Sequence, residues 1–201
     1  MAAATQDVVL VCGGRPMPPE NFHVTLAFVG SVPESSVAKV EAVGYQVAAE
    51  AERAPVQITM DAIEYWKKAK VVCATAQARQ SAGDLGPDDT RNRHGDEPAG
   101  QRIQDQREQR RLPSDTAGAG ARFADALAFA LKSRLTAAGF TPDLKPFHPH
   151  VTLARKVPHG SRDRAMQSVS WRFTEYALVE SRTQMQGAVY RVLESFSLVG
   201  P

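Results

Sequence analysis

Hydrophobic residues follow two different spacings along the chain. The run FHVTLAFVG at residues 22–30 is rich in β-branched and aromatic residues, which predicts a strand. In the stretch ESSVAKVEAVGYQVAAEAER, valines recur every three or four residues, which predicts an amphipathic helix. Two further apolar runs predict strands at 56–63 and 70–76, with Tyr65, Trp66 and two lysines in the connection between them.

The same kinds of pattern return in the second half of the chain. Residues 121–140 predict a helix that ends at Gly139. Its apolar face comprises Phe123, Leu127, Ala130, Leu131 and Leu135. A strand at 150–154 follows, and then two strands around 170–180 and 189–199. The order of elements predicts a duplicated α+β unit with halves at 1–78 and 121–201.

The segment between the halves has a different composition. Residues 79–120 contain seven basic and eight acidic residues and almost no large apolar ones. Such a segment cannot bury enough apolar surface to offset the conformational entropy that it would lose on ordering. We therefore expect a disordered insertion at 79–120.

Composition excludes several classes of protein. The chain has 201 residues, of which 43% are hydrophobic, and a formal net charge of +2. This composition indicates a globular domain without the strong positive field of a sequence-blind nucleic-acid binder. Cys12 and Cys73 lie far apart and outside any CxxC pattern, as is typical of a reducing compartment. The N-terminal residues resemble neither a signal peptide nor a membrane span, so we expect a cytoplasmic protein with no membrane partner.

The five residues HVTLA occur twice, at 23–27 and at 150–154. Side chains alternate along a strand, so His23 and Thr25 should share one face, and His150 and Thr152 should do so in the second copy. If the two halves pack about a pseudo-twofold axis, the two pairs face each other across a cleft.

Two opposed histidines suit an acid–base displacement at phosphorus. A neutral imidazole can activate water while a charged one protonates the leaving oxygen, and the threonine hydroxyls can donate hydrogen bonds to phosphate oxygens. Arg155 can add positive charge, but on a regular strand it lies with Val151 and Leu153, at the rim of the cleft. The near-identical motifs do not reveal which histidine is the acid.

Neighbouring residues have competing interpretations. His148 could join His150 and His23 in a three-histidine metal site, but no Asp or Glu nearby completes a ligand pattern, so we expect no metal. Phe147 could stack on a base or anchor a loop. For Trp66 we favour packing.

The two HxT motifs, in the contexts PPENFHVTLAFVG and PFHPHVTLARK, resemble those of the two-histidine (2H) phosphoesterase superfamily. Within it, they are most similar to the LigT-like RNA 2′,3′-cyclic phosphodiesterases, also called 2′-5′ RNA ligases. The resemblance covers residues 13–76 and 123–199. It implies a bilobal α+β fold, in which each lobe has an antiparallel sheet flanked by helices and the active site lies in the cleft between the lobes.

The resemblance also implies an activity and the residues that perform it. The reaction is hydrolysis of a 2′,3′-cyclic phosphate to a 2′-phosphomonoester without metal or cofactor, with reversible 2′-5′ RNA ligation as a side activity. His23 would be the proton donor to the leaving 3′ oxygen, and His150 the proton acceptor that activates water. The implied partners are RNA with 2′,3′-cyclic phosphate ends or small cyclic nucleotides.

Two features depart from the family pattern. Members have a strand and a helix before the PPEN segment, so a central strand of the first lobe could be missing here, and the insertion at 79–120 has no counterpart. A catalytically silent nucleotide- or RNA-binding module of the same fold is one alternative, and a metal-dependent phosphodiesterase that uses the HPH segment is another. No coiled-coil pattern is present, so we expect a monomer.

Overall fold

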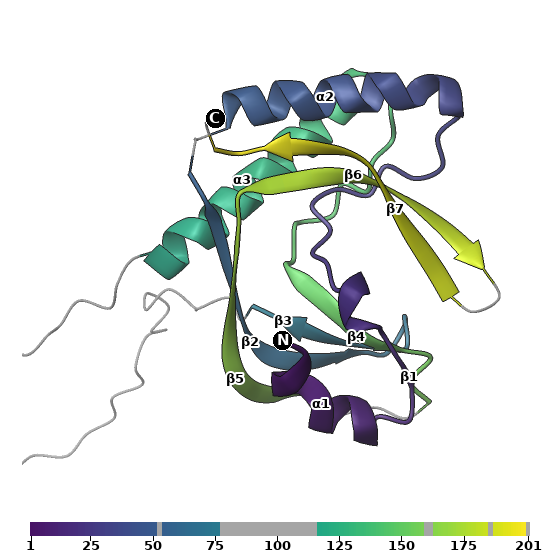
Figure 1. Cartoon of the computed structure of the whole chain (residues 1–201), viewed down its shortest axis with the longest axis vertical. Helices are drawn as coiled ribbons and strands as arrows, with labels where there is room; N and C mark the ends of the chain where they lie inside the picture. The colour runs from purple at the N-terminus through teal and green to yellow at the C-terminus, as the bar shows by residue number, and fades with distance from the viewer. Residues whose placement is uncertain (52–53, 77–115, 159–162, 185–186, 200–201) are drawn as a thin grey trace, which may run out of the picture. The chain divides into compact units, whose positions relative to one another are not determined.

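Antiparallel strands form two sheets (Figure 1). The computed structural model describes residues 1–51, 54–76, 116–158, 163–184 and 187–199. The first sheet has the strand order β1 (Arg15–Pro16), β4 (His150–Arg155), β3 (Val71–Thr75), β2 (Val56–Trp66) and β5 (Arg164–Phe173). The second pairs β6 (Glu175–Gln184) with β7 (Gly187–Ser197). Together with the helices, these sheets confirm the predicted α+β class.

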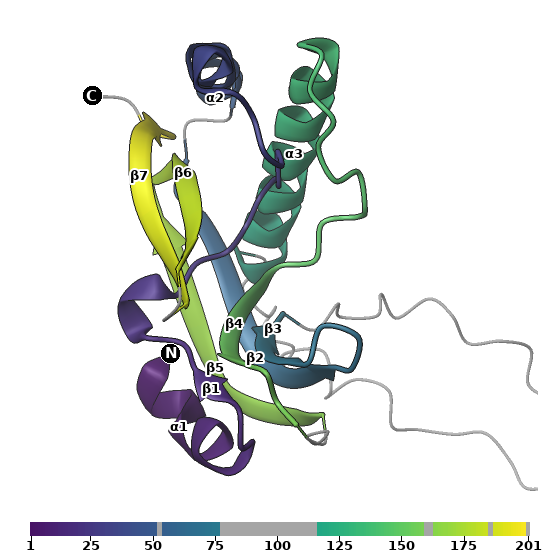
Figure 2. The same ribbon diagram turned by 90° about the vertical axis from the view of Figure 1, so that its right-hand side faces the viewer.

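Helices pack on both sheets. α3 (Thr116–Ala137) lies on β2, and α2 (Val37–Glu50) packs against both α3 and β7. α1 (Ala2–Val11) lies against β4 and β5 (Figure 2). Two 3₁₀ turns, η1 (Pro19–Asn21) and η2 (Glu34–Ser36), flank the first HVTLA copy. No helix in the described ranges combines the length and apolar character that a membrane crossing needs.

α2 confirms the helix predicted from valine spacing. Three of its valines are buried, Val40, Val43 and Val47. Gly44 lies on the same face, where an added Cβ atom would overlap the ring of Phe196. The hydroxyl of Tyr176 donates a hydrogen bond to the Gly44 carbonyl oxygen, 2.6 Å away. The missing side chain at this position therefore lets the β6–β7 sheet approach the helix.

The helix predicted at 121–140 is observed as α3, with an earlier start. Leu127, Leu131 and Leu135 are buried as predicted, and Gly139 has a φ of 87° just past the helix end, a conformation that glycine adopts readily. α3 begins at Thr116, so the prediction of disorder is wrong for residues 116–120. Extending an existing helix needs no new nucleation. The rest of the predicted insertion lies outside the described residues.

The first HVTLA copy does not lie on a strand, contrary to the prediction. Its alternation of faces is nevertheless observed, because Val24 and Leu26 pack against the core whereas His23 and Thr25 are exposed. A strand requires hydrogen bonds from a neighbouring strand as well as a suitable sequence. Among the described residues the second sheet contains only β6 and β7, and the segment 22–30 belongs to neither sheet.

Two strand boundaries also differ from the prediction. β2 continues to Trp66, so Tyr65 and Trp66 belong to the strand and the turn lies at 67–70. The run predicted around 170–180 is divided between β5 and β6, which belong to different sheets. Alternation cannot show where a chain leaves one sheet for another, because both strands have the same period.

Candidate active site

The second HVTLA copy lies on β4, as predicted. His150 pairs with Thr75 and Thr152 pairs with Cys73 on β3. Val151 is fully buried on the opposite face, whereas His150 and Thr152 are partly exposed. Strand alternation therefore brings the imidazole and the hydroxyl to one face of the sheet.

A β-bulge interrupts β4 directly after Thr152. Thr152 pairs with Cys73, but Ala154 pairs with Val72, the adjacent residue of β3. Leu153 and Ala154 are consecutive and both fully buried, which does not occur on a regular half-exposed strand. The bulge inserts one extra residue into β4 and shifts the alternation of everything that follows.

The bulge changes the place of Arg155. Arg155 pairs with Val71, and Val71 shares a face of β3 with Cys73 because side chains alternate. Arg155 therefore lies on the same face as Thr152, and the prediction that it keeps the opposite face is wrong. On the neighbouring β1, the exposed Arg15 pairs with Arg155, which the sequence patterns did not indicate.

The two motif histidines make the same backbone hydrogen bond. Nδ1 of His23 lies 2.7 Å from the carbonyl oxygen of Asn21, and Nδ1 of His150 lies 2.7 Å from the carbonyl oxygen of His148. A carbonyl oxygen only accepts, so Nδ1 is the donating nitrogen in each ring. Nε2 is then the nitrogen that can take a proton in the neutral ring or release one from the charged ring.

An aromatic ring packs against each motif histidine. Tyr190 on β7 meets His23 edge-on with ring centroids 4.9 Å apart, and Trp66 on β2 lies 4.5 Å from His150. These separations are those of interacting rings. The favoured packing role of Trp66 is confirmed, but its partner is a candidate catalytic residue. Only the pairing of β2, β3 and β4 reveals this contact, because 84 positions separate the two residues in the sequence.

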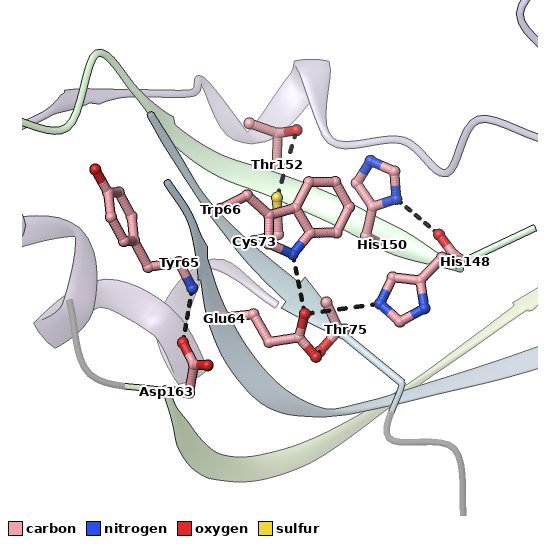
Figure 3. Close-up of polar contacts among 9 residues, drawn as sticks. All are labelled: Glu64, Tyr65, Trp66, Cys73, Thr75, His148, His150, Thr152 and Asp163. Carbon is pink, nitrogen blue, oxygen red and sulfur yellow. Dashed lines mark hydrogen bonds and ion pairs between the residues drawn. The ribbon is translucent and has the colours of Figure 1, made fainter. Parts of the chain in front are cut away.

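Glu64 connects Trp66, Thr75 and His148 beside His150 (Figure 3). The indole N–H of Trp66 donates to one carboxylate oxygen at 2.9 Å, and the hydroxyl of Thr75 donates to the other at 3.0 Å. Nε2 of His148 lies 3.7 Å from the carboxylate. Partial burial alone would raise the pKa of Glu64, but these hydrogen bonds and the charge of His148 lower it overall. Glu64 therefore stays ionised.

His150 has a lowered pKa. The main cause is burial, which removes water from the charged imidazolium, and the charges of His148 and His23 lower the pKa further. The Nδ1 hydrogen bond and the charge of Glu64 act in the opposite direction. At neutral pH the ring is therefore neutral.

Two neighbouring residues have no acid–base role in this geometry. Burial raises the pKa of Cys73 to about 12, so its thiol, 4.0 Å from the Thr152 hydroxyl, is not a nucleophile. Phe147 is partly buried and packs against the core, which fits the loop-anchor interpretation. The stacking of Phe147 on a nucleobase of the substrate stays a prediction.

The three-histidine alternative gains no support from the geometry. In the part of the chain that the structure describes, no group of three or more His, Cys, Asp or Glu residues is arranged to hold a metal ion. Nδ1 of both His23 and His150 is engaged by backbone oxygens, and His148 turns towards Glu64.

Known proteins resemble this chain in sequence and fold. The sequence profile of a family described as LigT like Phosphoesterase matches residues 1–73. An RNA 2′,3′-cyclic phosphodiesterase of Thermus thermophilus is 27% identical over 191 residues, which cover 94% of this chain and 77% of the relative.

Two solved structures share the fold. A phosphoesterase crystal structure has a TM-score of 0.65 at 19% identity and covers 100% of this chain and 94% of its own. Escherichia coli LigT in complex with 3′-AMP has a TM-score of 0.63 at 21% identity, with 93% and 82% covered. In sequence the chain is similar to the LigT-like phosphoesterases, and in fold it is similar to solved phosphoesterase structures.

Proposed function

We propose that this phosphoesterase hydrolyses 2′,3′-cyclic phosphates of RNA or of nucleotides to 2′-phosphomonoesters, with reversible 2′-5′ RNA ligation as a side activity. The observation that carries the proposal is that the two motif histidines make the same hydrogen bond. Each fixes Nδ1 on a backbone carbonyl oxygen at 2.7 Å, which leaves Nε2 to transfer a proton. The reaction needs no metal ion or cofactor.

In the proposed reaction the two histidines transfer protons on opposite sides of phosphorus. Neutral His150 takes a proton from water through Nε2 while the water oxygen attacks the phosphorus atom. The bond between phosphorus and the 3′ oxygen breaks, and charged His23 gives the proton of its Nε2 to that oxygen. His150 ends charged and His23 neutral, and exchange with water restores both. The lowered pKa of His150 suits the base, while the assignment of acid and base follows the family.

Thr25, Thr152 and Arg155 are the proposed contacts of the phosphate oxygens. Their hydroxyl and guanidinium donors would stabilise the negative charge that grows on these oxygens in the transition state. The bulge after Thr152 supports the inclusion of Arg155. Phe147 remains a candidate contact for a base.

Two relatives support the substrate class. The Thermus thermophilus relative carries the name RNA 2′,3′-cyclic phosphodiesterase, and Escherichia coli LigT has been crystallised with 3′-AMP. The name of the first protein and the ligand of the second both refer to nucleotides that carry phosphate at the ribose 2′ or 3′ position. Such a phosphate is the group on which the proposed pair of histidines would act.

A binding module without turnover is the second candidate. It is favoured by the position of the first motif, because His23 and Thr25 are exposed on a segment that belongs to neither sheet. The backbone that carries His23 has no neighbouring strand, so it makes fewer hydrogen bonds than the backbone of β4 that carries His150. The proposed proton donor is therefore held less firmly than the proposed acceptor.

Phosphorus NMR separates the two candidates. The full chain is incubated with 2′,3′-cyclic AMP, and separately with a short RNA that ends in a 2′,3′-cyclic phosphate, each with and without EDTA. We expect the cyclic signal to convert into that of a 2′-phosphomonoester in all four samples. Turnover abolished by EDTA would contradict the metal-independent mechanism. Binding without any product would favour the module.

A further inference from the structure

Trp66 restrains one side of the His150 ring. Its indole lies 4.5 Å from the imidazole, with the two planes inclined by 56°. The backbone hydrogen bond at Nδ1 fixes one edge of the imidazole, but a ring held at a single nitrogen can still tilt about that bond. The packing of the indole against the imidazole limits this tilt.

The indole is itself held by Glu64. The two residues lie two positions apart on β2 and therefore share a face, and the indole N–H donates to Glu64 at 2.9 Å. The other carboxylate oxygen accepts a hydrogen bond from Thr75 at 3.0 Å. Thr75 is fully buried and is the β3 partner of His150. Glu64 thus fixes the indole relative to the strand that carries the histidine (Figure 3).

We propose that Glu64 is a positioning residue for His150 that acts through the indole of Trp66. This inference rests on the proposed function, in which Nε2 of His150 has to face a water molecule in line with the bond that breaks. Small errors in the direction of a catalytic group cost much of the rate. Loss of the Glu64 hydrogen bond therefore lowers kcat and leaves KM nearly unchanged, because the proposed role of Glu64 is to hold Trp66 and not to bind substrate.

Two substitutions distinguish the hydrogen bond from the negative charge. In Glu64→Gln, the amide oxygen can still accept from Trp66 and the amide N–H group can donate to the Thr75 hydroxyl. In Glu64→Ala, both hydrogen bonds are lost. The positioning role predicts that kcat falls about tenfold in Glu64→Ala and stays within about twofold of wild type in Glu64→Gln.

The charge of Glu64 has a separate effect on pH dependence. Among the described residues, the charges that act on the His150 ring belong to His148 in the preceding loop, His23 in the first motif and Glu64 on β2. Of these, only Glu64 raises the pKa of His150. Glu64→Gln should therefore move the acid limb of kcat/KM to lower pH while kcat at neutral pH is retained.

Glu180 provides a matched control. Its side chain is 31% exposed against 30% for Glu64, and it accepts a hydrogen bond at 2.8 Å from Arg182, again two positions further along a strand. Tyr190, whose ring contacts His23, pairs with Ser181 and therefore shares a face of the β6–β7 sheet with it. Glu180 is the neighbour of Ser181 along β6, so its side chain lies on the opposite face, away from His23. Glu180→Ala should leave kcat unchanged.

The experiment combines kinetics on 2′,3′-cyclic AMP with NMR of the His150 ring protons, assigned by their absence in His150→Ala. We expect the ring-current shift from Trp66 to be lost in Glu64→Ala and kept in Glu64→Gln and Glu180→Ala. If Glu64→Ala fails to fold by circular dichroism, Glu64→Leu, which keeps a side chain of similar size without the carboxylate oxygens, replaces it with the same expected changes.

Two outcomes would overturn the inference. One is a wild-type kcat and an unshifted His150 signal in Glu64→Ala or its replacement. The other is a loss in Glu64→Gln as large as that in Glu64→Ala, which would assign the effect to charge. If the wild-type chain shows no turnover, the proposed function fails, and the NMR comparison still decides whether Glu64 positions the ring.

Discussion

Arg155 pairs with Val71 across β3 and β4, and this register places it on the face that carries His150 and Thr152. The bulge after Thr152 is the cause, because one inserted residue reverses the alternation that follows. A guanidinium on this face can bind the phosphate group of a substrate in a bidentate manner.

Replacing Arg155 with alanine should therefore weaken substrate binding. We expect KM for 2′,3′-cyclic AMP to rise about tenfold in Arg155→Ala, with an unchanged circular dichroism spectrum, because the exposed side chain contributes little to the core. The control is Arg172→Ala, an exposed arginine of β5 at the far edge of the same sheet. Equal KM values for Arg155→Ala and wild type would contradict the assignment.

The pH dependence of kcat/KM should report the lowered pKa of His150. As the pH falls through that pKa, the ring gains a proton and can no longer accept one from water, so activity is lost. Because burial lowers the pKa from its ordinary value of 6.5, the midpoint of the acid limb should lie below 6.5. Initial rates across the acidic range measure it. A midpoint above 6.5 would refute the base assignment.

Gly44 should be essential to the packing of α2 on the second sheet. In Gly44→Ala the added Cβ would overlap the ring of Phe196, and overpacking of this kind lowers the free energy of unfolding by about 1–3 kcal/mol. Alanine is otherwise the better helix former by about 1 kcal/mol. Ala42→Gly, on the exposed side of the middle of α2, measures that propensity alone. Urea unfolding gives both values, and a more stable Gly44→Ala would contradict the packing account.

The parts of the fold that depend on local periodicity could be predicted from the sequence. The valines of α2, the leucines of α3 and the alternation around His150 each need only the neighbouring residues along the chain, and all three are observed. The same alternation places His23 outward and Val24 inward even though no strand forms there.

The parts that depend on a partner strand could not be predicted. The bulge that moves Arg155 exists only in the register between β3 and β4. The contact of Trp66 with His150 likewise requires three strands side by side. Strand formation at the first motif fails for the same reason, since a β-rich sequence does not supply its own hydrogen-bonding neighbour.

The central claim is that His23 and His150 act as one acid–base pair. Measuring kcat/KM on 2′,3′-cyclic AMP for His23→Ala, His150→Ala and the double variant, each checked by circular dichroism, tests it most directly. Each single variant should lose at least about 10²-fold. The kcat/KM of the double variant should be only a little below that of the less active single variant, because removing either histidine already disables the pair. Wild-type rates in both single variants, or losses that simply multiply in the double variant, would contradict the account.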